Sequence, residues 1–151
     1  MAYEQLKLEN QLCFPLYAAS RLVIQEYQPH LEKLGITYPQ YLVLMILWET
    51  DSIAVSEITR RLILNTNTIT PVLKRMEAQG IITRQRSDAD ERKVIVTLTP
   101  KGKELQIEAA SIPEKLVAGL LSSNVDGEDL QRLKDQLHVI IQYLVDKQAN
   151  S

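Results

Sequence analysis

The thiol of Cys13 is the side chain best suited to covalent chemistry in this sequence of 151 residues, and it is the only cysteine. A lone cysteine excludes an intrachain disulfide and any metal site built on several thiolates. The two histidines, His30 and His138, have no cysteine or carboxylate at ligand spacing, so neither a metal nor another cofactor is expected. A free cysteine is most often a small buried hydrophobic residue, so Cys13 needs further support before it counts as reactive.

A second kind of chemistry, the recognition of phosphate, is indicated by the distribution of charge. The net charge is -2, but residues 56–103 contain ten Lys or Arg against five Asp or Glu, a net of +5 that leaves -7 for the rest. Phosphate contacts need local cations, whereas acidic flanks discourage indiscriminate binding. This distribution predicts a middle segment that faces duplex DNA.

The elements that position these groups follow from apolar periodicity. Residues 6–28 have apolar side chains at helical spacing and predict a helix that breaks before Pro29. Thr37 and Gln40 have the spacing of a capping box, which predicts a second helix to about residue 50. That helix is apolar nearly all round, so it should be buried on most sides.

Two short amphipathic segments follow, at residues 55–64 and 66–79, with only a residue or two between them. Two helices joined this tightly predict a helix-turn-helix. We expect the second helix to begin with Thr66 as its N-cap and to end at Gly80.

From residue 81 the apolar period becomes that of strands, and residues 81–98 predict a β-hairpin with a polar link at residues 87–91. Thr99 then caps another helix, because Pro100 suits a first helical position. The remainder is predicted to be helical, with a break at residues 112–113 and a loop at residues 122–127.

Helix, helix, tight turn, helix and hairpin is the order of a winged helix-turn-helix, so we expect a mainly α fold with a small β-hairpin wing. Residues 1–151 would form one domain, with a DNA-binding region at 37–103. The terminal helices, 1–36 and 104–151, either pack on their own domain or form a dimerisation layer. No apolar run is long enough to span a membrane and no secretory signal is recognisable, so a cytoplasmic protein without membrane contact is expected.

The polar residues of this region fall where a winged helix meets DNA. The N-terminal turn of the second short helix normally points into the major groove, where hydroxyl and amide groups meet base edges or phosphates. Candidates for this role are Thr66, Asn67, Thr68 and Thr70. Candidates for phosphate contacts on the same helix and the one before it are Lys74, Arg75, Arg60 and Arg61.

The hairpin supplies a further group of DNA-binding candidates. Arg92, at the tip, can enter the narrow and electronegative minor groove, and Asp90 can hold its guanidinium in a bidentate pair. Arg84 and Arg86 lie nearby on the hairpin. Each of these clusters is also common in proteins that bind nothing, as a cap, a solvated helix face or a charged turn. Their occurrence together in this order favours DNA binding.

At this point the sequence resembles the multiple-antibiotic-resistance (MarR) type of winged-helix regulators. The resemblance lies in residues 72–82, in the motif Asp90-Glu91-Arg92 and in residues 96–102. It implies a homodimer whose first and last helices interlock and whose two winged regions bind a pseudo-palindromic operator in double-stranded DNA. It also implies a repressor rather than an enzyme.

Within that family, residues 11–21 are similar to the organic hydroperoxide resistance regulators, which have a reactive cysteine at the start of the first helix. The resemblance matches Cys13 to that cysteine and Tyr27 and Tyr38 to its tyrosine partners, and Tyr17 stands one turn from Cys13. A helix N-terminus and phenolic donors both stabilise a thiolate. The resemblance therefore implies that an organic hydroperoxide oxidises Cys13 and that the protein then releases DNA.

Three other functions remain open from the sequence. A repressor of the same family could release DNA when a small aromatic ligand binds, with Cys13 inert. A thiol peroxidase would use Cys13 as its nucleophile, but no histidine or third activating group is recognisable nearby, which leaves only Arg21 open for that role. A helical interaction protein would bind no duplex DNA at all.

Overall fold

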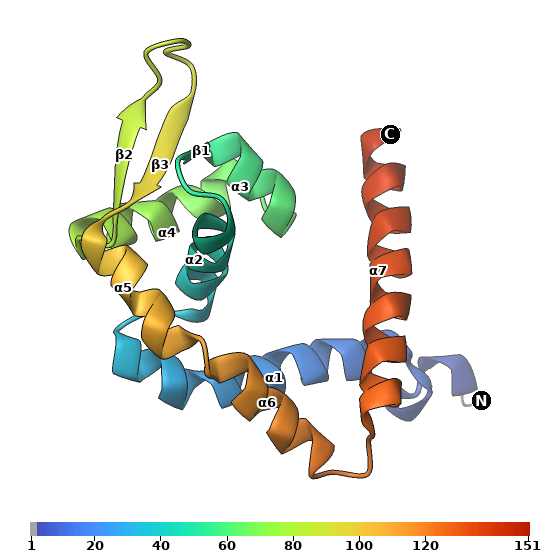
Figure 1. Cartoon of the computed structure of the whole chain (residues 1–151). Helices are drawn as coiled ribbons and strands as arrows, with labels where there is room; N and C mark the ends of the chain where they lie inside the picture. Colours follow the sequence, from blue (N-terminus) through green and yellow to red (C-terminus); the bar gives the residue numbers. More distant parts are fainter. Residues whose placement is uncertain (1–2) are drawn as a thin grey trace. The chain divides into compact units, whose positions relative to one another are not determined.

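The computed structural model describes residues 3–151 (Figure 1). These residues form seven α-helices, two 3-10 turns and a three-stranded sheet, in two compact units that divide after Ile112. The expected mainly α fold with a small β-hairpin wing is confirmed. The division falls inside the terminal region 104–151 that the sequence assigned to dimerisation.

The first long helix, α1 (Cys13–Leu34), differs from its prediction at both ends. Two 3-10 turns, η1 (Glu4–Leu6) and η2 (Leu8–Asn10), occupy the segment before it. The predicted break before Pro29 is wrong, because α1 continues through that proline. A proline inside a helix costs about 3 kcal/mol, and the burial of Leu31 just beyond it, at 2% exposure, offsets part of that cost.

The second helix, α2 (Tyr38–Glu49), begins as the sequence predicts. The backbone N–H of Thr37 donates to Oε1 of Gln40 at 3.1 Å, and the hydroxyl of Thr37 accepts from the backbone N–H of Gln40 at 3.4 Å. Half of its residues are buried, which confirms the expectation from its apolar composition. This helix forms the centre of the first unit.

The helix-turn-helix consists of α3 (Val55–Leu62) and α4 (Thr66–Ala78). The N-cap of α4 is Asn65, and not Thr66 as predicted, because Oδ1 of Asn65 accepts from the backbone N–H of Thr68 at 2.9 Å. The turn between the helices places Ile63 at φ 57°, a left-handed conformation that a β-branched residue rarely adopts. As predicted, α4 ends before Gly80.

The wing is formed by β2 (Ile82–Arg86) and β3 (Val94–Leu98), which pair antiparallel and project as a hairpin beyond the helices of this unit (Figure 1). A two-residue strand that the sequence did not predict, β1 (Ile53–Ala54), pairs with the other edge of β3. The core lies where the sheet, the helix-turn-helix and α2 pack together. Its fully buried side chains include Ile58, Ile69, Leu73, Met76, Ile82 and Val96.

The hairpin leads into α5 (Pro100–Ala109), whose predicted cap is formed by the Thr99 hydroxyl, which accepts from the backbone N–H of Gly102 at 3.1 Å. Gly102 lies so close to the residue before β2 that a Cβ atom there would be 2.3 Å from the backbone oxygen of Ile81. The indole N–H of Trp48 donates to the backbone oxygen of Gly102 at 3.0 Å, which ties α5 to α2. The glycine is therefore required by packing on both sides.

The last two helices are α6 (Ile112–Leu121) and α7 (Gly127–Ala149). The break predicted at residues 112–113 lies two residues earlier, at 110–111, because Ile112 and Pro113 form the first turn of α6. None of the residues of α7 is buried, although its sequence is apolar along one face. No helix within residues 3–151 is long and apolar enough to cross a membrane.

Candidate nucleic-acid interface and thiol site

The first turn of α4 presents the polar side chains that the sequence assigned to the major groove. Thr66, Asn67 and Thr68 are exposed, and Thr70 is half-buried. Two of the three hydroxyl groups already make hydrogen bonds within the helix: Thr68 donates to the Asn65 side chain at 3.0 Å, and Thr70 donates to the backbone oxygen of Thr66 at 2.8 Å. The Thr66 hydroxyl and the Asn67 amide make no hydrogen bond to the described part of the chain, so these two groups are the most available to bases.

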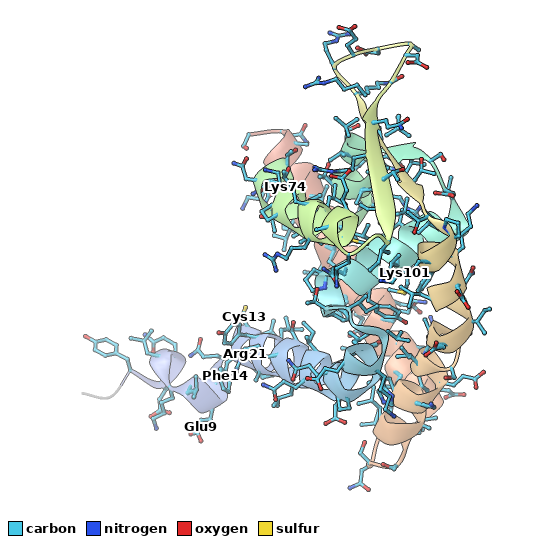
Figure 2. All side chains as sticks on the ribbon, turned by 90° about the vertical axis from the view of Figure 1, so that its left-hand side faces the viewer. Glu9, Cys13, Phe14, Arg21, Lys74 and Lys101 are labelled. Atoms are coloured by element: carbon cyan, nitrogen blue, oxygen red, sulfur yellow. The ribbon has the colours of Figure 1, made fainter. Side chains whose placement is uncertain are left out.

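The cations on the helix-turn-helix divide into free and paired groups. Lys74, labelled in Figure 2, and Arg75 are exposed on α4, and neither makes an ion pair within residues 3–151. In contrast, Arg60 pairs with Glu57, and Nη2 of Arg61 lies 2.8 Å from Oε2 of Glu49. The hydrogen bond from Arg60 lowers the pKa of Glu57, so this carboxylate stays charged and competes with phosphate for the guanidinium.

At the tip of the wing, the bidentate pair predicted between Arg92 and Asp90 is present. Nε and Nη2 of Arg92 lie 3.1 and 3.3 Å from the two carboxylate oxygens, and the backbone N–H of Arg92 donates to the same carboxylate at 3.1 Å. These bonds lower the pKa of Asp90. The Arg92 side chain is 91% exposed, so a single carboxylate orients a cation that is otherwise in solvent.

The other two wing arginines are held within the chain. Arg86 donates to the backbone oxygen of Glu91 at 2.8 Å and so closes the tip of the hairpin. Arg84 is bound by Glu77 at the end of α4, through its backbone N–H and through Nη2, both at 3.1 Å. The Nε of Arg84 is buried and has no partner in the described residues. Arg84 therefore acts as a brace between α4 and β2, and a contact between Arg84 and DNA stays a prediction.

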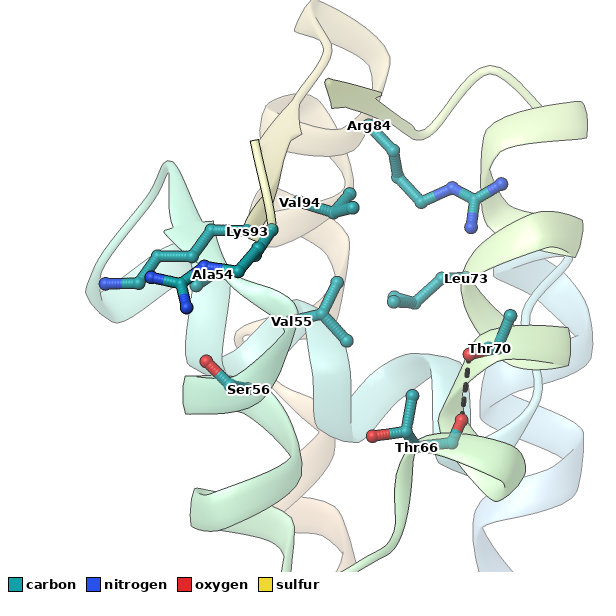
Figure 3. A pocket seen from close by; sticks show the side chains of 10 residues that line it. Ala54, Val55, Ser56, Thr66, Thr70, Leu73, Arg84, Lys93 and Val94 are labelled. Carbon is teal, nitrogen blue, oxygen red and sulfur yellow. Dashed lines mark hydrogen bonds between the residues drawn. The ribbon is translucent and has the colours of Figure 1, made fainter. Parts of the chain in front are cut away.

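A groove of about 330 Å³ separates the start of α3, the exposed side of α4 and the base of the wing (Figure 3). Its floor is apolar, because Val55, Leu73 and Val94 point toward one another. Its rim combines polar and cationic groups from the three elements, namely Ser56, Thr66, Thr70, Arg84, Arg92 and Lys93. This rim joins the first turn of α4 to the wing tip in one continuous polar surface.

Cys13 lies in the first turn of α1 and is exposed (Figure 2). Tyr17, one turn further along, is also exposed, at 63%. Arg21 stacks its guanidinium over the Tyr17 ring, 4.7 Å from the ring centroid. Arg21 is therefore engaged with Tyr17, about 12 Å along the helix axis from Cys13, too far to activate the thiol in the same chain.

Tyr27 and Tyr38 meet at the junction of α1 and α2, with their ring centroids 5.0 Å apart. Tyr41 completes the cluster, at 5.8 Å from Tyr27 and 6.2 Å from Tyr38. Burial raises the pKa of all three phenols, and the charges of neighbouring tyrosines raise those of Tyr38 and Tyr41 further. The phenols therefore remain protonated and able to donate at neutral pH.

The thiol and the tyrosine pair are not brought together within one chain. Fourteen residues separate Cys13 from Tyr27 on the same continuous helix, a rise of about 21 Å along its axis. A hydrogen bond from Tyr27 to the thiolate is therefore impossible in the same copy of the chain.

Comparison with known proteins identifies the family of transcriptional regulators to which this fold belongs. The family model described as transcriptional regulator SarA/Rot matches residues 25–108. The chain is 48% identical over 145 residues to the organic hydroperoxide resistance transcriptional regulator of Bacillus subtilis, which covers 96% of this chain and 97% of that protein. The chain belongs to the MarR/SarA-type winged-helix transcriptional regulators.

Three further comparisons support this assignment to the MarR/SarA-type regulators. The HTH-type transcriptional regulator MgrA of Staphylococcus aureus is 38% identical over 131 residues, which cover 86% of this chain and 89% of that protein. The structure of reduced AbfR bound to DNA has a TM-score of 0.75 at 38% identity and covers 95% of this chain and 98% of that one. An AbfR structure from Staphylococcus epidermidis has a TM-score of 0.74 at 37% identity and covers 95% and 97%.

Sequence reasoning missed three residues that shape the site of this MarR/SarA-type regulator. Glu77 fixes the wing to α4, Glu49 pairs with Arg61, and Asn65 caps α4. Asn65 had a detectable signal, since asparagine is a strong N-cap residue and directly precedes Thr66. No signal in the sequence marked Glu77 or Glu49, because their partners lie across a turn or on another helix.

Proposed function

We propose that this regulator is a homodimeric repressor that binds a pseudo-palindromic operator and releases it when an organic hydroperoxide oxidises Cys13. The observation that carries the proposal is the exposed thiol in the first turn of α1, in a chain 48% identical to an organic hydroperoxide resistance regulator. Peroxide must reach a sensor thiol, and a helix N-terminus favours its thiolate.

Residues 37–103 form the part of the chain that binds the operator. The first turn of α4 enters the major groove, where Thr66 and Asn67 face the bases and Lys74 and Arg75 neutralise phosphates. Arg92, oriented by Asp90, enters the minor groove at the wing tip. The solved complex of reduced AbfR with DNA supports this use of the fold.

The terminal segments, residues 1–36 and 104–151, form the dimer interface. Large apolar side chains are exposed near both ends, including Leu12, Leu16, Leu22, Val139, Ile140 and Tyr143. Exposed apolar faces of this size need a partner surface. A second copy of the chain also allows the thiol and the phenols to meet, because Tyr27 and Tyr38 of one copy can donate to Cys13 of the other.

The chemical step is a two-electron oxidation of sulfur. The Cys13 thiolate attacks the terminal oxygen of the hydroperoxide, the O–O bond breaks, and the alkoxide takes a proton and leaves as an alcohol. The sulfur becomes a sulfenic acid, which, with no second cysteine in the chain, persists, condenses with a small thiol or a backbone nitrogen, or oxidises further. The larger and more polar sulfur displaces its tyrosine partners and alters the spacing of the two recognition helices.

The oxidation state that causes release has to be identified directly. Among the relatives, overoxidised AbfR has been solved bound to DNA. In that protein, overoxidation and DNA binding are therefore compatible. We propose that release in this regulator follows the sulfenic acid or its thiol adduct, and the experiment below resolves these forms by mass.

The test begins with selection of bound duplexes from random DNA by the reduced protein. Wild type and Cys13→Ser are then titrated with the selected duplex before and after cumene hydroperoxide, while intact mass follows Cys13. We expect both reduced proteins to bind the duplex. After peroxide, wild type should bind it at least about tenfold more weakly, whereas Cys13→Ser should bind as before. Peroxide-driven release of Cys13→Ser would contradict the mechanism, and release of that variant by phenolic compounds instead would favour an aromatic ligand as effector.

A further inference from the structure

Gln40 is the one polar or charged residue that is buried among residues 3–151, at 3% exposure. Its carboxamide is bonded on both sides. Oε1 accepts from the backbone N–H of Thr37 at 3.1 Å, within the capping box of α2. Nε2 donates to Oε1 of Gln79 at 3.0 Å, 39 residues away in the sequence. A buried amide that is hydrogen-bonded at both its oxygen and its nitrogen restricts the positions of the groups around it.

Gln79 is the C-cap of α4, and it connects α4 to two further elements. Its Nε2 donates to the backbone oxygen of Gly35, at the end of α1, at 2.9 Å. Its backbone oxygen accepts from Nζ of Lys101, on α5, at 2.9 Å. The Gln40–Gln79 amide pair therefore joins the end of α1 and the start of α2 to the end of the DNA-binding helix α4.

The amide pair is adjacent to the tyrosine cluster. Gln40 lies between Tyr38 and Tyr41 in the first turn of α2, and both rings pack against Tyr27. A shift of Tyr38 large enough to move this turn must therefore carry Gln40 with it. Apolar side chains around the turn tolerate small slides, but leaving a buried amide unpaired costs about 1–3 kcal/mol. The end of α4 must follow Gln79, or the bond must break.

From this arrangement we infer that the Gln40–Gln79 amide pair is the positioning link that makes the orientation of α4 depend on the tyrosine cluster. This inference rests on the proposed function, because it describes how displacement of Tyr38 after Cys13 oxidation reaches the DNA-binding helix of the same chain. The pair touches neither peroxide nor DNA. It acts through Tyr38 at one end and through α4 at the other.

The test uses Gln79→Met, which keeps the length of the side chain but removes both amide bonds, to Gln40 and to Gly35. Gln79 is an exposed residue outside the Thr37–Gln40 capping box, so this variant leaves that box in place while Nε2 of Gln40 loses its partner. The matched control is Thr37→Ala, which removes the hydroxyl from the capping box but keeps the amide pair. A second control, Lys101→Met, removes a different side-chain bond to the same end of α4.

The quantity measured is the ratio of operator dissociation constants between oxidised and reduced protein, at equal Cys13 oxidation confirmed by mass. We expect the ratio in Gln79→Met to fall about fivefold or more below that of wild type, and the two controls to stay within about twofold of wild type. An unchanged ratio in Gln79→Met, or an equal fall in the controls, would overturn the inference. If wild type itself is oxidised without a change in affinity, the proposed function fails instead, which the wild-type measurement reveals on its own.

Discussion

The rings of Tyr27 and Tyr38 lie 5.0 Å apart, whereas Cys13 lies about 21 Å from Tyr27 along the same helix. The three residues that the sequence groups into one sensor therefore form two separate half-sites in each chain, a thiol at one end of α1 and a phenol pair at the other. The proposed sensor therefore needs two copies of the chain. This relationship determines the predictions for Cys13 chemistry.

Replacing Tyr27 or Tyr38 with Phe should slow oxidation of Cys13 by cumene hydroperoxide about tenfold, because each change removes a phenolic donor to the thiolate. Operator affinity of the reduced protein should stay within about twofold of wild type, because neither residue faces DNA. The rate is followed by rapid quench and intact mass. Tyr41→Phe is the matched control, since Tyr41 belongs to the same cluster but is 2% exposed. Equal slowing in Tyr41→Phe would contradict a specific role for the other two phenols.

The tyrosine cluster also predicts a loss of stability at alkaline pH. Because the folded state raises the pKa of Tyr27, Tyr38 and Tyr41, the folded protein retains protons that the unfolded chain releases. This contribution to stability is fully present below the ordinary tyrosine pKa of about 10 and is lost as pH rises toward the higher folded values. The absorbance of tyrosinate should rise in an early and a late phase, and Tyr41→Phe should reduce the late phase. A single phase at the ordinary pKa would contradict the burial of these rings.

Removing the wing-tip cation should weaken operator binding. Arg92→Ala should cost about 1–3 kcal/mol of binding free energy and reduce the slope of log K against log salt by about one. Asp90→Ala should cost less, because it removes the orientation of Arg92 and keeps its charge. The matched control is Arg132→Ala, which breaks another exposed Arg–Asp pair, with Asp129 at 2.7 Å on α7. An unchanged salt slope in Arg92→Ala would show that this side chain does not contact DNA.

The helix-turn-helix turn should be a site where stability can be gained. Ile63 has φ 57° and is 55% exposed, so it carries backbone strain and contributes little to the core. Asparagine tolerates this conformation, and Ile63→Asn should raise the free energy of unfolding by about 1 kcal/mol in urea denaturation. Ile107→Asn, at a 76% exposed position in α5, is the control and should give no gain. A loss of stability in Ile63→Asn would indicate that the apolar side chain packs on a partner surface.

The fold could be predicted where its determinants are local. The capping box of Thr37 and Gln40, the stop at Gly80 and the Thr99 cap each involve residues within a few positions of one another, and all three occur as expected. The continuation of α1 through Pro29 could not be predicted, because it depends on tertiary burial of Leu31. The two-residue β1 is too short to leave a periodic pattern.

The same distinction holds for the candidate site. The Asp90–Arg92 pair was predictable because its members are two residues apart. The Glu77–Arg84 brace crosses the turn from α4 into β2, and the Gln40–Gln79 pair joins helices 39 residues apart. Nothing in the sequence pairs these residues. The family resemblance grouped Cys13 with Tyr27 and Tyr38, and the structure adds the distance that keeps them apart in one chain.

The most direct test of a sensor shared between two chains uses a heterodimer purified with two different affinity tags. One chain contains Cys13→Ser, and the other contains Tyr27→Phe and Tyr38→Phe, so the only Cys13 faces the intact tyrosines of the opposite chain. We predict that this Cys13 is oxidised by cumene hydroperoxide at the wild-type rate and that the heterodimer then loses operator affinity. Oxidation at the slow rate of the Tyr27→Phe, Tyr38→Phe homodimer would contradict the account.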